Sequence, residues 1–239
     1  MSTAKLIAAC LISTGVSGLY AQTMKHEMLQ NVAQLSASGT VEVQQDVLSI
    51  MMNTTVGGAD ASTVQTQLKQ ALDTALAQAR QAQQGLAPGL LDVRTGNFSL
   101  YPRYGKDGKI NGWQGSTELV LEGKDFARIT STAGKIQTLT LGNVSFTLSR
   151  EQRAKVEGDA QSLAMERFKA KALEVSKGFG FSGYTLREVS ITANDQGNIP
   201  PRPRMLAMAK SDMSSESAVP VEAGRSTVLV NVTGSVQMK

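Results

Sequence analysis

Residues 149–177 read SREQRAKVEGDAQSLAMERFKAKALEVSK, and this stretch decides the class of fold. Ser149 and Gln152 have the spacing of a capping box, in which side chains satisfy the backbone groups at a helix N-terminus. Apolar residues then recur at intervals of three and four, which is the period of one helix face. The pattern predicts a long amphipathic helix from Ser149 to Lys177, with an apolar stripe of Val156, Ala160, Leu163, Ala164, Phe168, Ala172 and Val175.

Strand patterns flank this helix on both sides. Upstream, Leu35–Val43 and Val47–Val56 are separated by the polar residues QQD and are predicted to form a hairpin. A second hairpin is predicted for Leu91–Tyr104 and Ile110–Glu122, because the intervening Asp107-Gly108 favours a tight reversal. Further strands are predicted at Val144–Leu148, Tyr184–Thr192 and Ser226–Met238.

Two more helices are predicted between these strands. The first begins at Asp60 or Ser62, which are residue types that cap helices, and it ends at Gly85 and Pro88. A shorter helix follows Asp125, where apolar residues again recur at helical spacing.

These elements fit an α+β fold. Two or three amphipathic helices would pack on one side of a mostly antiparallel sheet. Within that sheet, Val228–Met238 is predicted to pair with Ser36–Val43. Both are valine-alternating runs with a central glycine, and both need a partner for their backbone groups.

The first segment has the features of a secretory signal peptide. Met1–Ala21 contains a cation, a short apolar run and small residues before its last alanine. We therefore expect cleavage after Ala21, a flexible segment at residues 22–33 and one folded domain over residues 34–239. The mature chain would contain no transmembrane span and would be periplasmic. A lipoprotein signal ending at Cys10 is the alternative.

The composition excludes several kinds of catalytic site. The 239 residues include one histidine, His26, and one cysteine, Cys10, and both lie near the N-terminus. Ser-His-Asp and Cys-His catalysis and Cys/His zinc sites are therefore excluded from the folded body. We expect no cofactor and no metal. The chain has 24 Lys and Arg against 20 Asp and Glu, and these cations are scattered, which argues against nucleic-acid binding.

Paired carboxylates are the enzymatic alternative that remains. A histidine-free hydrolase would need two acids about 5 to 9 Å apart. The candidates are Glu118 with Glu122 and Glu157 with Asp159, but their surroundings lack the aromatic residues of a sugar-binding cleft. The simpler interpretation is that these acids are solvated surface charges.

The glycine-rich stretch Gly178–Gly183 matches the pattern G-x-G-x-x-G of dinucleotide-binding turns. It follows a helix and precedes a strand, so no helix N-terminus would face a bound pyrophosphate. We instead predict that Gly178 and Gly180 end the long helix and that Phe179 and Phe181 pack into the core.

A long loop, residues 193–225, separates the last two predicted strands. A loop of this length in a compact domain is usually functional or mobile. Its prolines disfavour an interior strand, and its methionines supply flexible apolar side chains suited to varied contacts. The predicted contact residues are Pro200, Pro201, Arg202, Met205, Met208 and Met213, although a plain connector is the open alternative.

Several short sequence motifs follow one another in a characteristic order along almost the whole mature chain. They are Ser38–Val43, Leu100–Tyr104, Ile110–Trp113, Arg167–Ala172, Gly180–Tyr184 and Pro220–Gly224. This order resembles the SIMPL domain family, secreted bacterial proteins that include periplasmic immunogenic and oxidative-stress defence proteins. Two residues depart from the family pattern, since Gln45 replaces a proline and Trp113 stands where tyrosine is frequent.

The resemblance implies a non-catalytic protein that acts by binding or self-assembly, with a role in the envelope or in oxidative-stress defence. The family has no agreed catalytic residues, so none can be transferred to this chain. We expect the partner to be a second copy of the chain or another envelope protein.

Overall fold

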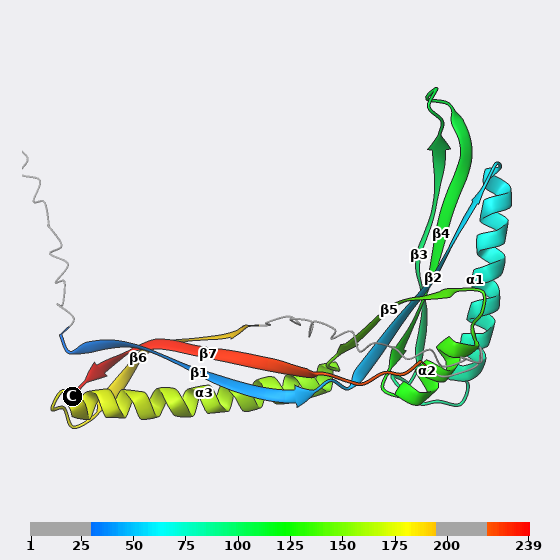
Figure 1. The fold of residues 1–239 in the computed structure, drawn as a ribbon. Helices are drawn as coiled ribbons and strands as arrows, with labels where there is room; N and C mark the ends of the chain where they lie inside the picture. The colour runs from blue at the N-terminus through cyan, green and yellow to red at the C-terminus, as the bar shows by residue number, and fades with distance from the viewer. Residues whose placement is uncertain (1–29, 195–218) are drawn as a thin grey trace, which may run out of the picture.

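The computed structural model describes residues 30–194 and 219–239. Its strands divide between two antiparallel sheets, and each sheet packs against helices of its own. Figure 1 shows the two parts as the arms of an L. The α+β class predicted from the sequence is confirmed, although the strands form two sheets rather than one.

The three-stranded arm contains β1 (Val32–Gln44), β7 (Arg225–Met238) and β6 (Tyr184–Asn194) in the order β1-β7-β6. The long helix α3 (Arg150–Gly178) runs along this sheet (Figure 1). Alternate valines of β7 pack against small residues of α3 because strand side chains point to opposite faces in turn. The buried core of this arm consists of Ala160, Ala164, Phe168, Ala172, Val230, Val232 and Val236.

The four-stranded arm has the strand order β3-β4-β2-β5. Helices α1 and α2 pack against its sheet, and its core cluster includes Leu48, Ile50, Leu119, Leu121 and Ile129. The bounds of its elements are β2 (Val47–Gly58), α1 (Ala61–Gln83), β3 (Asp92–Tyr104), β4 (Ile110–Gly123), α2 (Phe126–Lys135) and β5 (Thr140–Thr147).

The predicted pairing of the first and last strands is confirmed. β1 and β7 are antiparallel, with Ser36 opposite Thr233 and Val41 opposite Val228. The central glycine of β1 has a packing role as well. A Cβ atom at Gly39 would lie 2.0 Å from the carbonyl oxygen of Ala160, so the strand can approach α3 this closely only at a glycine.

The predicted helix ends are also confirmed. Asp60 caps α1 by accepting from the N–H of Thr63, and Asp125 caps α2. At the end of α3, Gly180 has a φ of 82°. The N–H groups of Gly180 and Phe181 donate to carbonyl oxygens in the last turn of α3, which is the Schellman arrangement.

The prediction that Phe179 lies in the core is wrong. Phe181 is half-buried, whereas the side chain of Phe179 is 71% exposed. Phe179 is the C-cap residue, and the chain reverses at the left-handed Gly180 directly after it. Its ring therefore no longer follows the buried stripe of α3.

The predicted hairpin of β1 and β2 is also wrong, whereas that of β3 and β4 is confirmed. β1 pairs with β7 in one sheet, and β2 pairs with β4 and β5 in the other. The link between them, Gln45–Asp46, contains neither the glycine nor the asparagine that favours a two-residue hairpin turn. The chain therefore passes from one arm into the other at these two residues.

Candidate functional site

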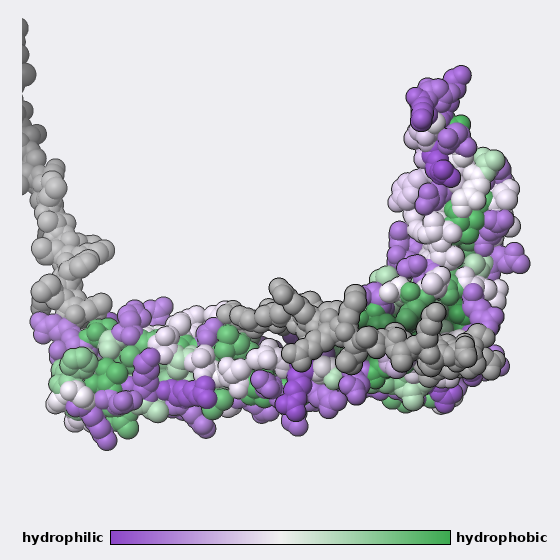
Figure 2. All heavy atoms as spheres, viewed as in Figure 1, coloured by the Kyte–Doolittle hydropathy of each residue, from purple (hydrophilic) through white to green (hydrophobic). Residues whose placement is uncertain are grey.

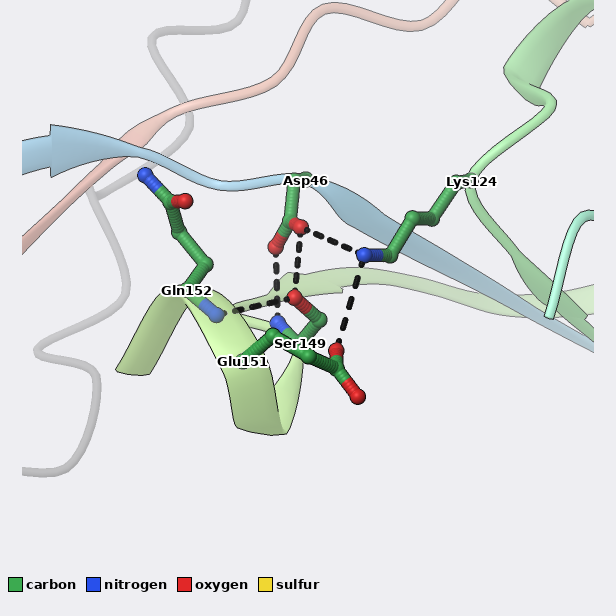
Figure 3. Close-up of polar contacts among 5 residues, drawn as sticks. All are labelled: Asp46, Lys124, Ser149, Glu151 and Gln152. Atoms are coloured by element: carbon green, nitrogen blue, oxygen red, sulfur yellow. Dashed lines mark hydrogen bonds and ion pairs between the residues drawn. The ribbon is translucent and has the colours of Figure 1, made fainter. Parts of the chain in front are cut away.

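A polar cluster joins the two arms at their corner (Figure 3). The carboxylate of Asp46 accepts hydrogen bonds from the N–H and the hydroxyl of Ser149, at 2.7 and 2.6 Å. The Nζ atom of Lys124 lies 3.3 Å from Asp46 and 3.6 Å from Glu151. The cluster therefore ties the β1–β2 link to the start of α3 and to the residue that follows β4.

The capping box predicted at Ser149 is half present. Its hydroxyl oxygen accepts a hydrogen bond from the N–H of Gln152 at 3.3 Å, as predicted for the N-cap of α3. The N–H of Ser149 donates to Asp46, and Figure 3 shows the Gln152 amide pointing away. Partial burial acts to raise the pKa of Asp46, but the hydrogen bonds from Ser149 and the charge of Lys124 outweigh it and lower the pKa.

Gln45 forms a second tie between the arms. Its side chain is buried, and its Nε2 donates to the carbonyl oxygen of Phe146 and to the hydroxyl of Ser226, at 3.1 and 3.0 Å. Its backbone N–H donates to the carbonyl oxygen of Gly224 at 3.0 Å. A proline has no N–H and could not make this last bond.

The open edge of the three-stranded sheet carries an exposed apolar row. In the described residues, β6 pairs only with β7. A bulge between Leu186 and Glu188 shifts the register, so that Leu186, Val189 and Ile191 lie opposite Val236, Gly234 and Val232. These three side chains, which we call the β6 row, share the α3 side of the sheet and are 50%, 44% and 41% exposed.

The bulge depends on a glycine in the neighbouring strand. A Cβ atom at Gly234 would lie 2.3 Å from the carbonyl oxygen of Glu188. Any other residue there would push β6 away from β7. The row remains exposed because α3 packs mainly on β1 and β7.

The other edge of the same sheet, β1, accepts side-chain hydrogen bonds at two of its carbonyl oxygens. Arg167 donates from Nη1 to the carbonyl oxygen of Ser38 at 2.8 Å, and Lys171 donates from Nζ to that of Ser36 at 3.1 Å. Cations on an edge strand are one of the common devices that prevent further strands from pairing. The two edges of one sheet therefore differ, since cations of α3 lie against β1 at Ser36 and Ser38, whereas β6 presents an exposed apolar row.

A shallow groove of about 720 Å³ lies between α1 and α2. Its lining is mixed in charge, with Asp125 beside Arg128 and Lys135, and includes Gln78 and Gln81. Asp125 is engaged as the N-cap of α2, accepting from the N–H of Arg128 at 2.9 Å. The Asp125 carboxylate is therefore already engaged within the fold.

The carboxylates considered for a hydrolase are not arranged as that reaction requires. Glu118 and Glu122 are four residues apart on β4, which corresponds to about 13 Å along a strand. Glu122 pairs with Arg94 at 3.2 Å, and Glu118 accepts from the N–H of Asn97 at 3.1 Å. Glu157 and Asp159 are two residues apart on α3 and point in different directions.

The described ranges, 30–194 and 219–239, offer neither a metal-binding cluster nor a helix that could span a membrane. No group of three or more His, Cys, Asp and Glu side chains there could hold a metal ion. No helix in the same ranges is both long enough and apolar enough to cross a membrane.

The predicted contact loop falls largely outside the described residues. This applies to all six of its named residues, Pro200, Pro201, Arg202, Met205, Met208 and Met213, and also to Cys10, His26 and the predicted cleavage site. The β6 row has no period-two signal in the sequence, because a bulge places Leu186 and Val189, three residues apart, on one face. The contacts of Arg167 and Lys171 with β1 could have been predicted from the sequence. These two cations are one helical turn apart and lie beside the buried stripe of the helix.

The fold and these surfaces define a two-armed α+β protein in which, among the described residues, β6 is an edge strand with an exposed apolar row. The model of the SIMPL family, described as "Protein of unknown function (DUF541)", matches residues 33–236. The chain therefore belongs to the SIMPL family, as its resemblance indicated. A comparison with curated proteins found no match.

Proposed function

We propose that this SIMPL-family chain is a non-catalytic, exported envelope protein whose copies assemble through the open edge of β6. The observation that carries the proposal is the contrast between the two edges of the three-stranded sheet. Two carbonyl oxygens of β1 accept from Arg167 and Lys171, whereas β6 presents three exposed apolar side chains in the described structure. Exposed apolar rows on unpaired edge strands are surfaces at which further chains add.

The sequence of β6 complements itself when two copies run antiparallel. A two-fold axis between Arg187 and Glu188 would place Leu186 opposite Val189 of the second copy. The same register would place Tyr184 opposite Ile191 of the second copy, so that apolar side chains meet on the α3 side. Such an interface is isologous, because each copy contributes the same residues.

The charges on the other side of the sheet agree with this register. Arg187 donates to Oε1 of Gln237 at 2.6 Å, and Glu188 lies opposite Ser235, so both project away from α3. In the two-fold arrangement, Arg187 of each copy would lie opposite Glu188 of the other. Opposite charges in directly facing positions stabilise strand pairs.

Sedimentation velocity of the chain from Gln22 onward tests the assembly. Ile191→Lys should shift the protein towards the monomer, because it places a charge in the apolar row. Leu141→Lys is the matched control, since Leu141 is also a strand residue with 41% exposure but lies on β5 in the other arm. Wild-type protein that is monomeric at all concentrations, or equal behaviour of the two variants, would refute the proposal.

A charge exchange tests the register itself. Glu188→Arg alone would place four arginines around the two-fold axis and should weaken assembly. Adding Arg187→Glu to it restores opposite charges across the axis and should recover much of the loss. If the double variant assembles no better than Glu188→Arg, the interface has another register.

Export and the envelope role rest on the first 21 residues and on the family resemblance. Mass spectrometry of the exported protein should find Gln22 as its first residue. A chain that starts at Met1, or at a lipidated Cys10, would contradict the expected processing. Survival of cells under peroxide, with the gene deleted and then restored, tests the role in oxidative-stress defence.

A further inference from the structure

The β3–β4 hairpin extends past the rest of the four-stranded arm (Figure 1). The last residue of β2, Gly58, lies opposite Trp113 of β4. Beyond this point, residues 103–112 form a two-stranded ribbon that no third strand flanks within the described structure. Two-stranded ribbons are marginally stable in water. Contact with another surface would therefore stabilise this one.

Large side chains are exposed near the end of this ribbon. Tyr101 and Tyr104 are each 63% exposed, and Ile110 is 51% exposed. Tyr104 and Ile110 lie directly opposite each other, beside the turn. These side chains are not part of either core cluster, so the packing of the arm does not account for them.

The same end of the hairpin is positively charged. Between Tyr101 and Trp113 the sequence has three cations, Arg103, Lys106 and Lys109, and one acid, Asp107. The acid is engaged in the turn, where its Oδ1 accepts from the N–H of Lys109 at 3.3 Å. All three cations are exposed, and Figure 2 shows a predominantly hydrophilic tip.

We infer that this hairpin tip binds the surface of an anionic lipid bilayer. Arg103, Lys106 and Lys109 would lie among the lipid phosphates, to which basic residues are attracted. Tyr104 and Ile110 would enter the interface, where tyrosine rings are favoured because they are apolar with one polar end. The tip projects from the fold and is narrow, which suits a planar surface better than a ligand that must be enclosed.

A hollow beside the tip gives the headgroups a further contact. It has a volume of about 350 Å³ and is lined by Tyr101 and Arg103 together with residues of β2 and β4. A phosphate there would lie beside the guanidinium of Arg103, which matches phosphate geometry well. This inference is independent of assembly through β6, because the hairpin belongs to the other arm.

Co-sedimentation with vesicles tests the charged part of the inference. The chain from Gln22 onward should bind vesicles of phosphatidylglycerol and phosphatidylcholine and should bind pure phosphatidylcholine weakly. Lys106→Glu combined with Lys109→Glu should reduce binding by about tenfold or more. The matched control is Lys155→Glu with Lys169→Glu, which makes the same change in net charge at exposed positions of α3 and should leave binding unchanged.

Tyr104→Ser combined with Ile110→Ser tests the apolar part and should also weaken vesicle binding. Circular dichroism melting of each variant identifies any loss that comes from unfolding. The inference is overturned if the wild type does not bind vesicles that contain phosphatidylglycerol. It is also overturned if the Lys106/Lys109 variant and the Lys155/Lys169 control lose vesicle binding to the same extent. It is also overturned if the serine variant binds like the wild type while heparin competes fully, because the tip would then be a site for soluble polyanions.

Discussion

Each arm buries one face of an antiparallel sheet under helix, but the two arms use different amounts of helix. The four-stranded sheet packs against both α1 and α2, and its core cluster contains leucine, isoleucine and methionine side chains. Among the helices of the described residues, only α3 packs on the three-stranded sheet, and alanines make up much of its smaller core cluster. A single helix lying close to a sheet covers two strands well, so the third strand, β6, is exposed from Thr185 to Ala193.

This difference suggests that the arms have different tasks. The four-stranded arm contains the larger core, so we expect it to stay folded when the other arm is disrupted. The three-stranded arm has less apolar area to bury, and it would gain from a second sheet joined at β6. Changing one arm at a time separates their contributions to stability and assembly.

The largest effect is expected from removal of the last twelve residues, Val228–Lys239. β7 is the central strand of the three-stranded sheet, so its loss leaves both β1 and β6 without a partner. Hydrogen exchange should show that amides of β1 and α3 lose protection while those of β2 and β4 keep it. Protection that is unchanged in β1 would contradict the pairing, and its loss in both arms would show that the arms fold as one unit.

Two glycine-to-alanine changes in the three-stranded arm should have opposite signs. Gly39→Ala places a Cβ against the backbone of α3 and should lower the free energy of unfolding by about 3 kcal/mol or more. Gly158→Ala is the control on α3, where a Cβ would meet nothing within 4 Å. It should raise the free energy of unfolding by about 0.5 to 1 kcal/mol, as expected for an exposed helix position. Urea denaturation measures both, and similar values for the two variants would argue against close packing at Gly39.

A smaller effect is expected at the corner between the arms. Asp46→Asn removes the ion pair with Lys124 and weakens the bonds from Ser149, which should cost about 1 to 3 kcal/mol at neutral pH. Asp92→Asn, at an exposed aspartate on β3, is the control and should change stability little.

The corner also makes stability depend on pH. Because the pKa of Asp46 is lower in the folded protein than in the unfolded chain, its contribution is complete above the unfolded pKa. The contribution is lost as the pH falls through the folded pKa. Denaturation measured from pH 7 down to the acidic range should therefore show a smaller decrease for Asp46→Asn than for wild type. Parallel curves for the two proteins would contradict a stabilising role of the Asp46 carboxylate.

The sequence predicted most of the local structure because its signals are local. Asp60, Asp125 and Ser149 cap helices where the pattern placed them, and Gly180 ends α3 as expected. The pairing of β1 with β7 also followed from their matching alternation.

The division into two arms could not be predicted, because it depends on contacts between residues far apart in the chain. The link at Gln45–Asp46 is fixed by hydrogen bonds with Ser149 and Ser226 and by an ion pair with Lys124. None of these three residues is close to the link in sequence. The β6 row has the same kind of origin, since the bulge that aligns it depends on Gly234 in another strand.

The central claim is that two copies pair through β6, and a cysteine crosslink tests it most directly. The chain from Gln22 onward has no cysteine, so Leu186→Cys with Val189→Cys introduces the only two thiols. In the proposed register, each new cysteine lies opposite the other cysteine of the second copy, at a separation that suits a disulfide. Mild oxidation should give a covalent dimer with the double variant and little dimer with Leu186→Cys alone. A double variant that remains monomeric on a denaturing gel while wild-type protein sediments as an oligomer would contradict assembly through β6.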